Sequence, residues 1–190
     1  MKKVLVISLL VSLILTMFGC QMRDKKTAVI GGADAPTNIL VTENGIDEVN
    51  LTVSTDDGKE PIPAKLYKGD GYSIYIPKSG YRYEKDYDDG TIEDKWEYIK
   101  RDDVSIEVIT YKHTDKELAQ KMFLRENDDY IFEDLMGYPL CGKEPDGDTL
   151  WFSAYEANGH SYILSWEYPG HTDEKIREEL SAIAGTFKAE

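Results

Sequence analysis

Hydrophobic and polar residues alternate along five segments beyond residue 70, and each of these segments predicts a β-strand. The segments are 72–76, 95–100, 104–108, 150–155 and 161–168. Pro77 ends the first segment, and Asn158-Gly159 separates the last two. An Asn-Gly pair between alternating segments is typical of a tight β-hairpin. The polar residues 101–103 suit a second hairpin.

Two further segments carry apolar residues at helical spacing. Thr114 and Glu117 form a capping box, which predicts the start of the first helix. Asp173 and Glu174 follow Thr172 at the start of the second, where acidic side chains complement the helix dipole. The two apolar stripes are Leu118, Ala119, Met122 and Phe123, and Ile176, Leu180, Ile183, Ala184 and Phe187.

Both predicted helices are apolar on one side, so both need a sheet to cover. The order of the elements predicts an α+β fold at residues 66–190. In this fold, an antiparallel sheet of five or six strands packs with two helices.

The first twenty residues have the layout of an export signal. Lys2 and Lys3 precede the apolar segment 4–18, which Gly19, Cys20 and polar residues follow. This layout is typical of a secretory signal peptide, and the segment is shorter than the about 20 residues of a membrane span. The Gly-Cys pair resembles the lipobox of bacterial lipoproteins, in which the cysteine is lipidated and becomes the first residue.

This resemblance implies that residues 1–19 are a lipoprotein signal peptide and that Cys20 carries a lipid. The lipid would anchor the protein at the extracytoplasmic face of the cell membrane. Met17 and Phe18 are bulkier than the usual lipobox residues, so an ordinary signal peptide and an uncleaved anchor are alternatives. Residues 20–65 are polar and rich in turn-forming residues, which predicts a tether. Two short apolar segments within it, 39–42 and 49–53, are candidate strands without an evident partner.

Residues 30–39 of the predicted tether read Ile-Gly-Gly-Ala-Asp-Ala-Pro-Thr-Asn-Ile. They resemble the Gly-Gly-Ala-Asp-Gly-Pro-Thr signature of the beta subunit of sodium-translocating decarboxylases. In that family the aspartate lies within the membrane and takes part in cation transport. Here Ala35 replaces a glycine, and no predicted transmembrane helices surround Asp34. We therefore expect a feature of the leader rather than an ion site.

The chain is strongly acidic, with 22 Lys plus Arg, 36 Asp plus Glu and a formal net charge of −14. Nucleic-acid binding requires a basic surface, so this class of partner is excluded. Simple electrostatic binding to anionic lipid is excluded for the same reason. Loss of residues 1–19 would remove Lys2 and Lys3 and no acidic residue, so the exported chain would be more acidic still. Membrane attachment must therefore come from the lipid.

The chain offers little for thiol or zinc chemistry. If Cys20 is lipidated, Cys141 has no cysteine partner, and its neighbours in sequence do not favour a reactive thiolate. We expect Cys141 to be a packing residue. The histidines His113, His160 and His171 lack the spacing of a zinc site. No cofactor is predicted.

Two acidic clusters are the candidates for a metal site. Asp86, Asp88 and Asp89 precede a glycine, and Asp146 and Asp148 flank another. Calcium takes oxygen ligands of this kind, although neither cluster matches a complete EF-hand loop. The alternative interpretation is a pair of solvated turns.

Aromatic residues are the candidates for a ligand surface. Trp151 and Tyr155 lie on the strand face opposite Phe152, and Tyr75 lies opposite Ile74. Rings on an open sheet face can bind a sugar or a peptide. If a helix covers this face too, the same rings belong to the core, and we favour this second interpretation.

The order of the elements and three landmark sequences resemble PsbP-like domains. The landmarks are Tyr-Ser-Ile-Tyr-Ile-Pro at 72–77, Thr-x-x-Glu-Leu-Ala at 114–119 and Gly-Thr-Phe at 185–187. The resemblance spans residues 66–189. It implies an accessory, binding or assembly protein, without a catalytic motif to carry over.

These observations favour a non-enzymatic surface lipoprotein that binds or scaffolds an envelope protein or glycan. The first alternative is a carboxylate-dependent hydrolase of a cell-wall or extracellular substrate, acting through acids such as Asp146 and Asp148. The second alternative is a calcium or small-ligand sensor.

Overall fold

The computed structural model describes residues 47–55, 58–88, 90–133, 140–143 and 147–190. The predicted signal peptide, Cys20 and the segment around Asp34 lie outside these residues. The described elements are, in chain order, β1 Glu48–Thr55, β2 Gly58–Lys68, β3 Tyr72–Pro77, β4 Tyr81–Asp88, β5 Thr91–Tyr98, β6 Ser105–Lys112, α2 Lys116–Glu126, β7 Ile131–Glu133, β8 Leu140–Lys143, β9 Thr149–Ala157, β10 His160–Tyr168, α3 Glu174–Ala184 and β11 Lys188–Ala189.

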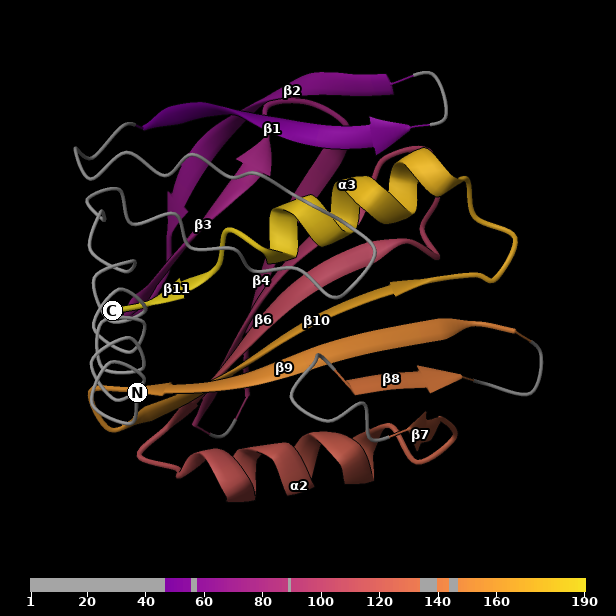
Figure 1. Ribbon diagram of the computed structural model, residues 1–190. Helices are drawn as coiled ribbons and strands as arrows, with labels where there is room; N and C mark the ends of the chain where they lie inside the picture. Colours follow the sequence, from indigo (N-terminus) through magenta and orange to yellow (C-terminus); the bar gives the residue numbers. More distant parts are fainter. Residues whose placement is uncertain (1–46, 56–57, 89, 134–139, 144–146) are drawn as a thin grey trace, which may run out of the picture.

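The described strands form two antiparallel sheets. One has four strands in the order β1-β2-β3-β11, and the other has seven in the order β4-β5-β6-β10-β9-β8-β7. Figure 1 shows the layers: the β1–β2 hairpin at the top, then α3, then the seven-stranded sheet, and α2 at the bottom. No helix among the described residues is long and apolar enough to cross a membrane.

The structure confirms the α+β class with antiparallel strands and two helices, but the expected single sheet of five or six strands is wrong. Helix α3 packs against β1 and β3 on one side and against β6 and β10 on the other. Because its burial requires cover on both sides, the strands divide into two sheets with the helix between them.

The β1–β2 hairpin lies in the segment that was assigned to the tether. Val49 pairs with Ala64 in this hairpin, and Leu51 and Val53 are buried. The missing partner of segment 49–53 is therefore β2, which contains two prolines. Proline lacks a backbone donor and is rare inside sheets, so β2 was interpreted as a loop. The predicted start of the folded domain at residue 66 is consequently too late.

Strand β4 was also missed, because it is polar on both faces. After Tyr81, every residue of this strand is exposed. The strand forms an edge of the seven-stranded sheet, and charged side chains on an edge hinder pairing with other chains. The alternation that reveals a half-buried strand is therefore absent.

The two predicted hairpins are confirmed. Strands β9 and β10 meet at Asn158 and Gly159, whose φ angles are 51° and 75°. A type I′ turn needs this left-handed conformation at both residues. Strands β5 and β6 form the second hairpin, and Val104, Ile106 and Val108 are fully buried as predicted.

Helix α2 has a different cap from the predicted one. A carboxylate oxygen of Asp115 accepts a hydrogen bond from the Leu118 backbone N–H at 2.9 Å. The Thr114 hydroxyl instead donates to a backbone carbonyl outside the helix. Ala119 and Phe123 are buried as predicted, but Leu118 is 48% exposed.

The apolar side chains form two clusters, one on each face of the seven-stranded sheet. The larger cluster lies around α3 and includes Leu180, Ile183 and Ala184 of its predicted stripe. The smaller cluster lies under α2 and contains Tyr111, Ala119, Phe123, Leu150, Phe152 and Ile163. A helix thus packs on each face of the sheet.

Candidate functional site

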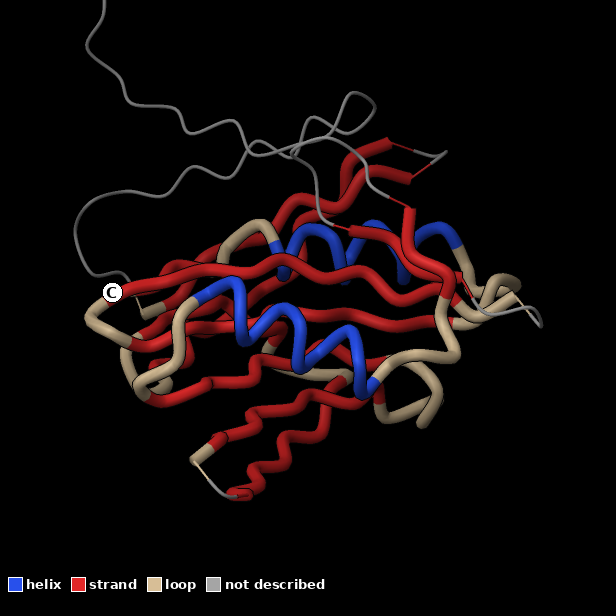
Figure 2. The backbone as a smooth tube through the Cα atoms, turned by 90° about the horizontal axis from the view of Figure 1, so that it is seen from below, coloured by secondary structure: helices blue, strands red, loops and turns tan. Residues whose placement is uncertain are grey.

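The α2 face of the seven-stranded sheet has an apolar part and a polar part. Helix α2 packs against β9 and β10, where Leu150, Phe152 and Ile163 are buried beneath it. Figure 2 looks at this side, and the hairpin of β4 and β5 projects beyond the helix. The side chains of β4 and β5 on this face are polar or charged.

Strand register places three glutamates along the border between the two parts, with Glu93 and Glu167 diagonal to Glu107 on its two sides. Glu107 of β6 lies directly opposite Lys95 of β5 and Ser165 of β10. Glu93 and Glu167 lie two positions away from Lys95 and Ser165 on the same strands. Residues two apart in a strand share one face, and diagonal neighbours lie within reach of long side chains.

These residues line a cavity of about 140 Å³, which we call the glutamate pocket. Its polar residues include Glu93, Lys95, Ser105, Glu107, Ser165 and Glu167. Ile109, Phe123 and Leu150 provide an apolar part of the lining. Asn127 also lines the pocket, and its side chain donates to the Phe123 carbonyl at 2.9 Å, at the C-terminal end of α2.

Glu107 is the most perturbed acid of the pocket. Burial and then the hydrogen bond and charge of Glu93 raise the pKa of Glu107 to about 9, while Lys95 lowers it. The charge of Glu167 also raises the pKa of Glu107. Two adjacent carboxyl groups cannot easily ionise together, so Glu107 keeps its proton at neutral pH.

Two serines of the pocket have hydroxyls without a protein partner among the described residues. Ser105 is 8% exposed and Ser165 is 3% exposed, and neither side chain forms a hydrogen bond with any described residue. Ser161, four residues earlier on β10, is also buried, but its hydroxyl donates to the Thr114 carbonyl at 2.7 Å. Neither hydroxyl is among the described side-chain atoms that are sealed from solvent without a partner. Both serines line the cavity, so their hydroxyls can bond to water or to a bound molecule.

A second buried carboxylate, Asp94 of β5, lies on the opposite face of the sheet. Its oxygens accept hydrogen bonds from Tyr67 at 2.8 Å, from Tyr72 at 2.7 Å and from Tyr83. Lys85 Nζ lies 3.2 Å away. Burial raises the pKa of Asp94, but these hydrogen bonds outweigh it and hold the pKa below its usual value. Because these residues come from β2 and β3 as well as β4 and β5, the network joins the two sheets.

The predicted acidic clusters lie elsewhere. Asp86 and Asp88 belong to the exposed strand β4, and Asp148 lies just before β9. Asp89 and Asp146 are outside the described residues. Within the part of the chain that the structure describes, no group of three or more His, Cys, Asp or Glu side chains is placed to hold a metal ion.

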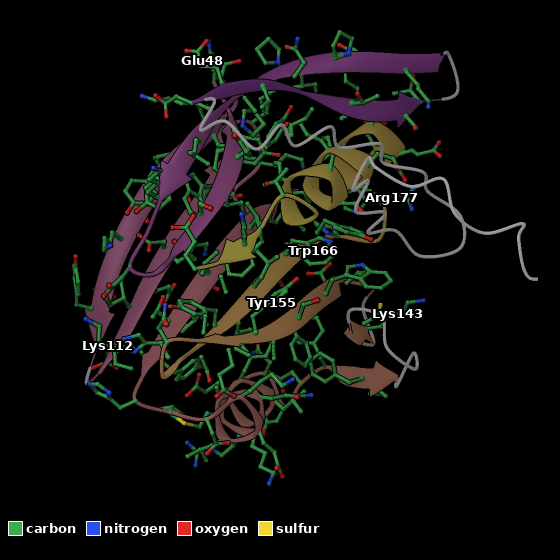
Figure 3. All side chains as sticks on the ribbon, turned by 60° about the vertical axis from the view of Figure 1, so that its left-hand side comes forward. Glu48, Lys112, Lys143, Tyr155, Trp166 and Arg177 are labelled. Atoms are coloured by element: carbon green, nitrogen blue, oxygen red, sulfur yellow. The ribbon has the colours of Figure 1, made fainter. Side chains whose placement is uncertain are left out.

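The aromatic candidates pack against the core on the α3 side. The ring of Trp151 stacks on Trp166 with centroids 6.2 Å apart. Tyr155 packs on Phe187 with centroids 4.6 Å apart, and Tyr75 is partly buried against the same cluster. Figure 3 labels Tyr155 and Trp166 on the strands below α3. The helix covers this face, so these rings contribute to the core.

The structure brings together two histidines that are far apart in sequence. The rings of His113 and His160 lie 5.3 Å apart, where the ends of β6 and β10 meet. His171 lies 3.3 Å from the Arg101 guanidinium. Cys141 is buried on β8, as expected of a packing residue.

No protein-family model and no curated protein matches the sequence. Two solved structures are similar to parts of the chain. A crystal structure from Bacteroides thetaiotaomicron is 18% identical with a TM-score of 0.37, and the match covers 63% of this chain and 45% of that one. The solution structure of cyanobacterial PsbP (CyanoP) from Synechocystis is 12% identical with a TM-score of 0.44, over 79% of this chain and 97% of that one. The matched part of this chain thus spans less than half of the length of the Bacteroides protein.

Proposed function

We propose that this protein is a non-enzymatic binding module of the bacterial cell envelope that holds its ligand in the glutamate pocket. The observation that carries the proposal is a cavity in which Ser105 and Ser165, whose hydroxyls bond to no described residue, lie beside three glutamates. A structural polar cluster satisfies its own members, as the network around Asp94 does. A binding site instead keeps polar groups for its ligand.

The location at the envelope is proposed from the N-terminal sequence. The basic start, the apolar segment 4–18 and the Gly19-Cys20 pair support a lipid on Cys20 and an extracytoplasmic position. The landmark sequences support a PsbP-like accessory domain as part of the same proposal. Metabolic labelling with a radioactive fatty acid tests the anchor. The full-length chain should take up label and Cys20→Ala should not, and equal labelling of both would contradict the proposal.

Two-dimensional NMR of the isotope-labelled full-length chain tests the pocket. Neutral monosaccharides, alkylamines and short peptides are titrated in turn. At least one of these classes should shift the amide signals of Ser105, Glu107 and Ser165. Ser165→Val should reduce the shifts at a given ligand concentration, whereas Glu156→Gln, an exposed acid on β9, should leave them unchanged. If no class shifts these signals, the binding proposal fails.

The proton that Glu107 keeps beside Glu93 favours one second candidate, a carboxylate-dependent hydrolase. A protonated carboxyl group next to a second one can act as the acid in such enzymes, and this pair would take the role assigned to Asp146 and Asp148. The carboxyl groups of glycosidases are about 5 to 9 Å apart. An assay with chromogenic glycosides and peptides tests this candidate. Hydrolysis by the unaltered chain that is lost in Glu107→Gln would show that the protein is an enzyme.

A further inference from the structure

The charges around the glutamate pocket are unbalanced. Three glutamates and one cation, Lys95, line the cavity. Lys95 Nζ also lies 3.6 Å from Glu97, a further carboxylate on the same strand. Even with Glu107 protonated at neutral pH, the lining has more acidic than basic side chains, which disfavours an anionic ligand. A cationic group complements the pocket.

The polar groups of the pocket are mainly hydrogen-bond acceptors. Ionised carboxylates only accept, and a serine hydroxyl can accept through two lone pairs. Glu167 already receives a hydrogen bond from Tyr130, whereas Ser105 and Ser165 receive none from a described side chain. A primary ammonium group has three N–H donors and no acceptor. It can therefore donate to a glutamate and to both serines at once.

The apolar residues of the pocket restrict the remainder of the ligand. Ile109, Phe123 and Leu150 line the same cavity and offer contacts to methylene groups. A cavity of about 140 Å³ holds a few non-hydrogen atoms, and not a folded peptide or a sugar chain. An unbranched alkyl chain that ends in an ammonium group has this size and this division between apolar and charged parts.

We infer that the glutamate pocket binds a primary ammonium group at the end of an alkyl chain, an inference that rests on the proposed binding function. Glu93 and Glu107 provide the counter-charge, and Ser105 and Ser165 accept the other N–H groups. The ammonium comes either from a lysine side chain or from a free alkylamine, since the two share this chemistry.

Entry of the ammonium releases a proton from the pocket. Glu107 holds this proton because it is buried beside Glu93, and a cation at the same place favours the ionised form. The proton passes to water, and no covalent bond of the ligand changes. The titratable and charged groups near Glu107 are Glu93, Lys95, Tyr111, Glu126 and Glu167. The affinity therefore increases with pH until Glu107 is ionised in the free protein, near pH 9.

Isothermal titration calorimetry of the full-length chain with pentylammonium tests the inference. At pH 7 the titration is run in phosphate and in HEPES, which contain no primary amine and differ in ionisation enthalpy, so a released proton appears as a difference in binding heat. We expect close to one proton per ligand and about tenfold tighter binding at pH 8 than at pH 7. Pentanol, the neutral analogue, should not bind. N-acetyl-lysine methylamide in a parallel titration distinguishes a lysine side chain from a free amine.

Substitutions test whether the amine binds in the glutamate pocket. Glu107→Gln should remove the proton release and the pH dependence, and Ser165→Val should weaken binding about fivefold. Glu156→Gln, outside the pocket, should bind as the unaltered chain does. Equal binding of pentanol, or binding of a monosaccharide alone, would overturn the ammonium inference and leave the binding function in place. Amine binding that no pocket variant changes would also overturn the inference, and a pocket that binds no probe would overturn both proposals.

Discussion

Asp94 and Glu107 lie on adjacent strands but on opposite faces of one sheet, and their surroundings give the two carboxyl groups opposite properties. Tyrosine hydroxyls and the Lys85 ammonium surround Asp94 and hold its pKa below the usual value. Glu107 lies beside other carboxyl groups, and its pKa rises to about 9. Burial acts in the same direction at both sites. The hydrogen-bonding character of the neighbours therefore decides which group is charged.

This difference separates a structural cluster from a candidate binding site. The Asp94 network has a donor for each of its acceptors, and it connects strands of the two sheets. The glutamate pocket has more acidic than basic side chains, and it has two serine hydroxyls that bond to no described residue. These hydroxyls face the cavity, where water or a ligand can bond to them. The comparison thus predicts that substitutions at the first site act on stability and that substitutions at the second act mainly on binding.

Replacing Asp94 should have the largest effect. Asp94→Asn removes the charge that compensates Lys85 and places an amide N–H donor where a carboxylate oxygen accepted hydrogen bonds. We therefore expect a loss of about 3 kcal/mol in the free energy of unfolding. Urea denaturation at pH 7 measures this loss. Asp86→Asn, the same change on exposed β4, should stay within about 0.5 kcal/mol. Equal losses in the two variants would show that Asp94 does not join the sheets.

Removing one hydroxyl from the network should have the next largest effect. Tyr72 donates to the buried Asp94 carboxylate at 2.7 Å, and Tyr72→Phe should cost about 2 kcal/mol, as expected for a hydrogen bond to a charged group. The Tyr162 hydroxyl is buried too, but it has no hydrogen-bond partner among the described residues. Tyr162→Phe should therefore be nearly neutral in the same denaturation experiment. A larger loss in Tyr162→Phe would reverse this interpretation.

The two acids should affect opposite ends of the pH profile of stability. The pKa of Glu107 is raised from 4.5 to about 9 on folding, so the folded chain holds a proton that the unfolded chain has lost. Its contribution is complete below about pH 4.5 and declines as the pH rises toward 9. The pKa of Asp94 is lowered from 3.8, so its contribution is lost as the pH falls below about 4.

Glu107→Gln should therefore be more stable than the unaltered chain at pH 8, by about 1 kcal/mol after allowance for solvent screening. The two chains should have similar stability at pH 4.5. Denaturant midpoints at pH 4.5, 6 and 8 measure the difference. Parallel profiles would mean that Glu107 titrates normally in the folded chain.

The smallest effect concerns two serines of β10. Ser161→Ala removes the hydrogen bond to the Thr114 carbonyl and should cost about 1 kcal/mol. Ser165→Ala removes a hydroxyl without a described partner and should change the free energy of unfolding by less than about 0.5 kcal/mol. Thermal unfolding of both variants gives the comparison. A similar loss in both would remove the observation on which the proposed function depends.

The sequence predicted those elements that bury one face and expose the other. The alternation around Val104 and Ile106 and the Asn158-Gly159 turn gave the correct hairpins, because burial on one face produces a readable period of two. Strand β2 was missed because its prolines are typical of loops, and β4 was missed because neither of its faces is buried.

The candidate site could not be predicted in the same way. Glu93, Glu107 and Glu167 are far apart in sequence, and each occupies an ordinary polar position of an alternating strand. Their convergence depends on the register of three strands and on the place where α2 ends. One signal in the sequence was available. Strands β5, β6 and β10 carry glutamate or serine on the α2 face, where β9 has the apolar residues Leu150 and Phe152. Asp86 and Asp148, which the sequence predicts as candidates for a metal site, lie at exposed or turn positions, where charged side chains favour solubility alone.

The position of α3 between the two sheets has a consequence for synthesis of the chain. Strands β1 to β10 all precede this helix, yet β1, β3, β6 and β10 contact it. While the ribosome produces the earlier segments, the apolar faces of both sheets lack the element that fills the space between them. Contacts of large sequence separation form slowly, and uncovered apolar surface promotes association of nascent chains. The protein should therefore complete its folding late and need protection from aggregation until the last helix has been made.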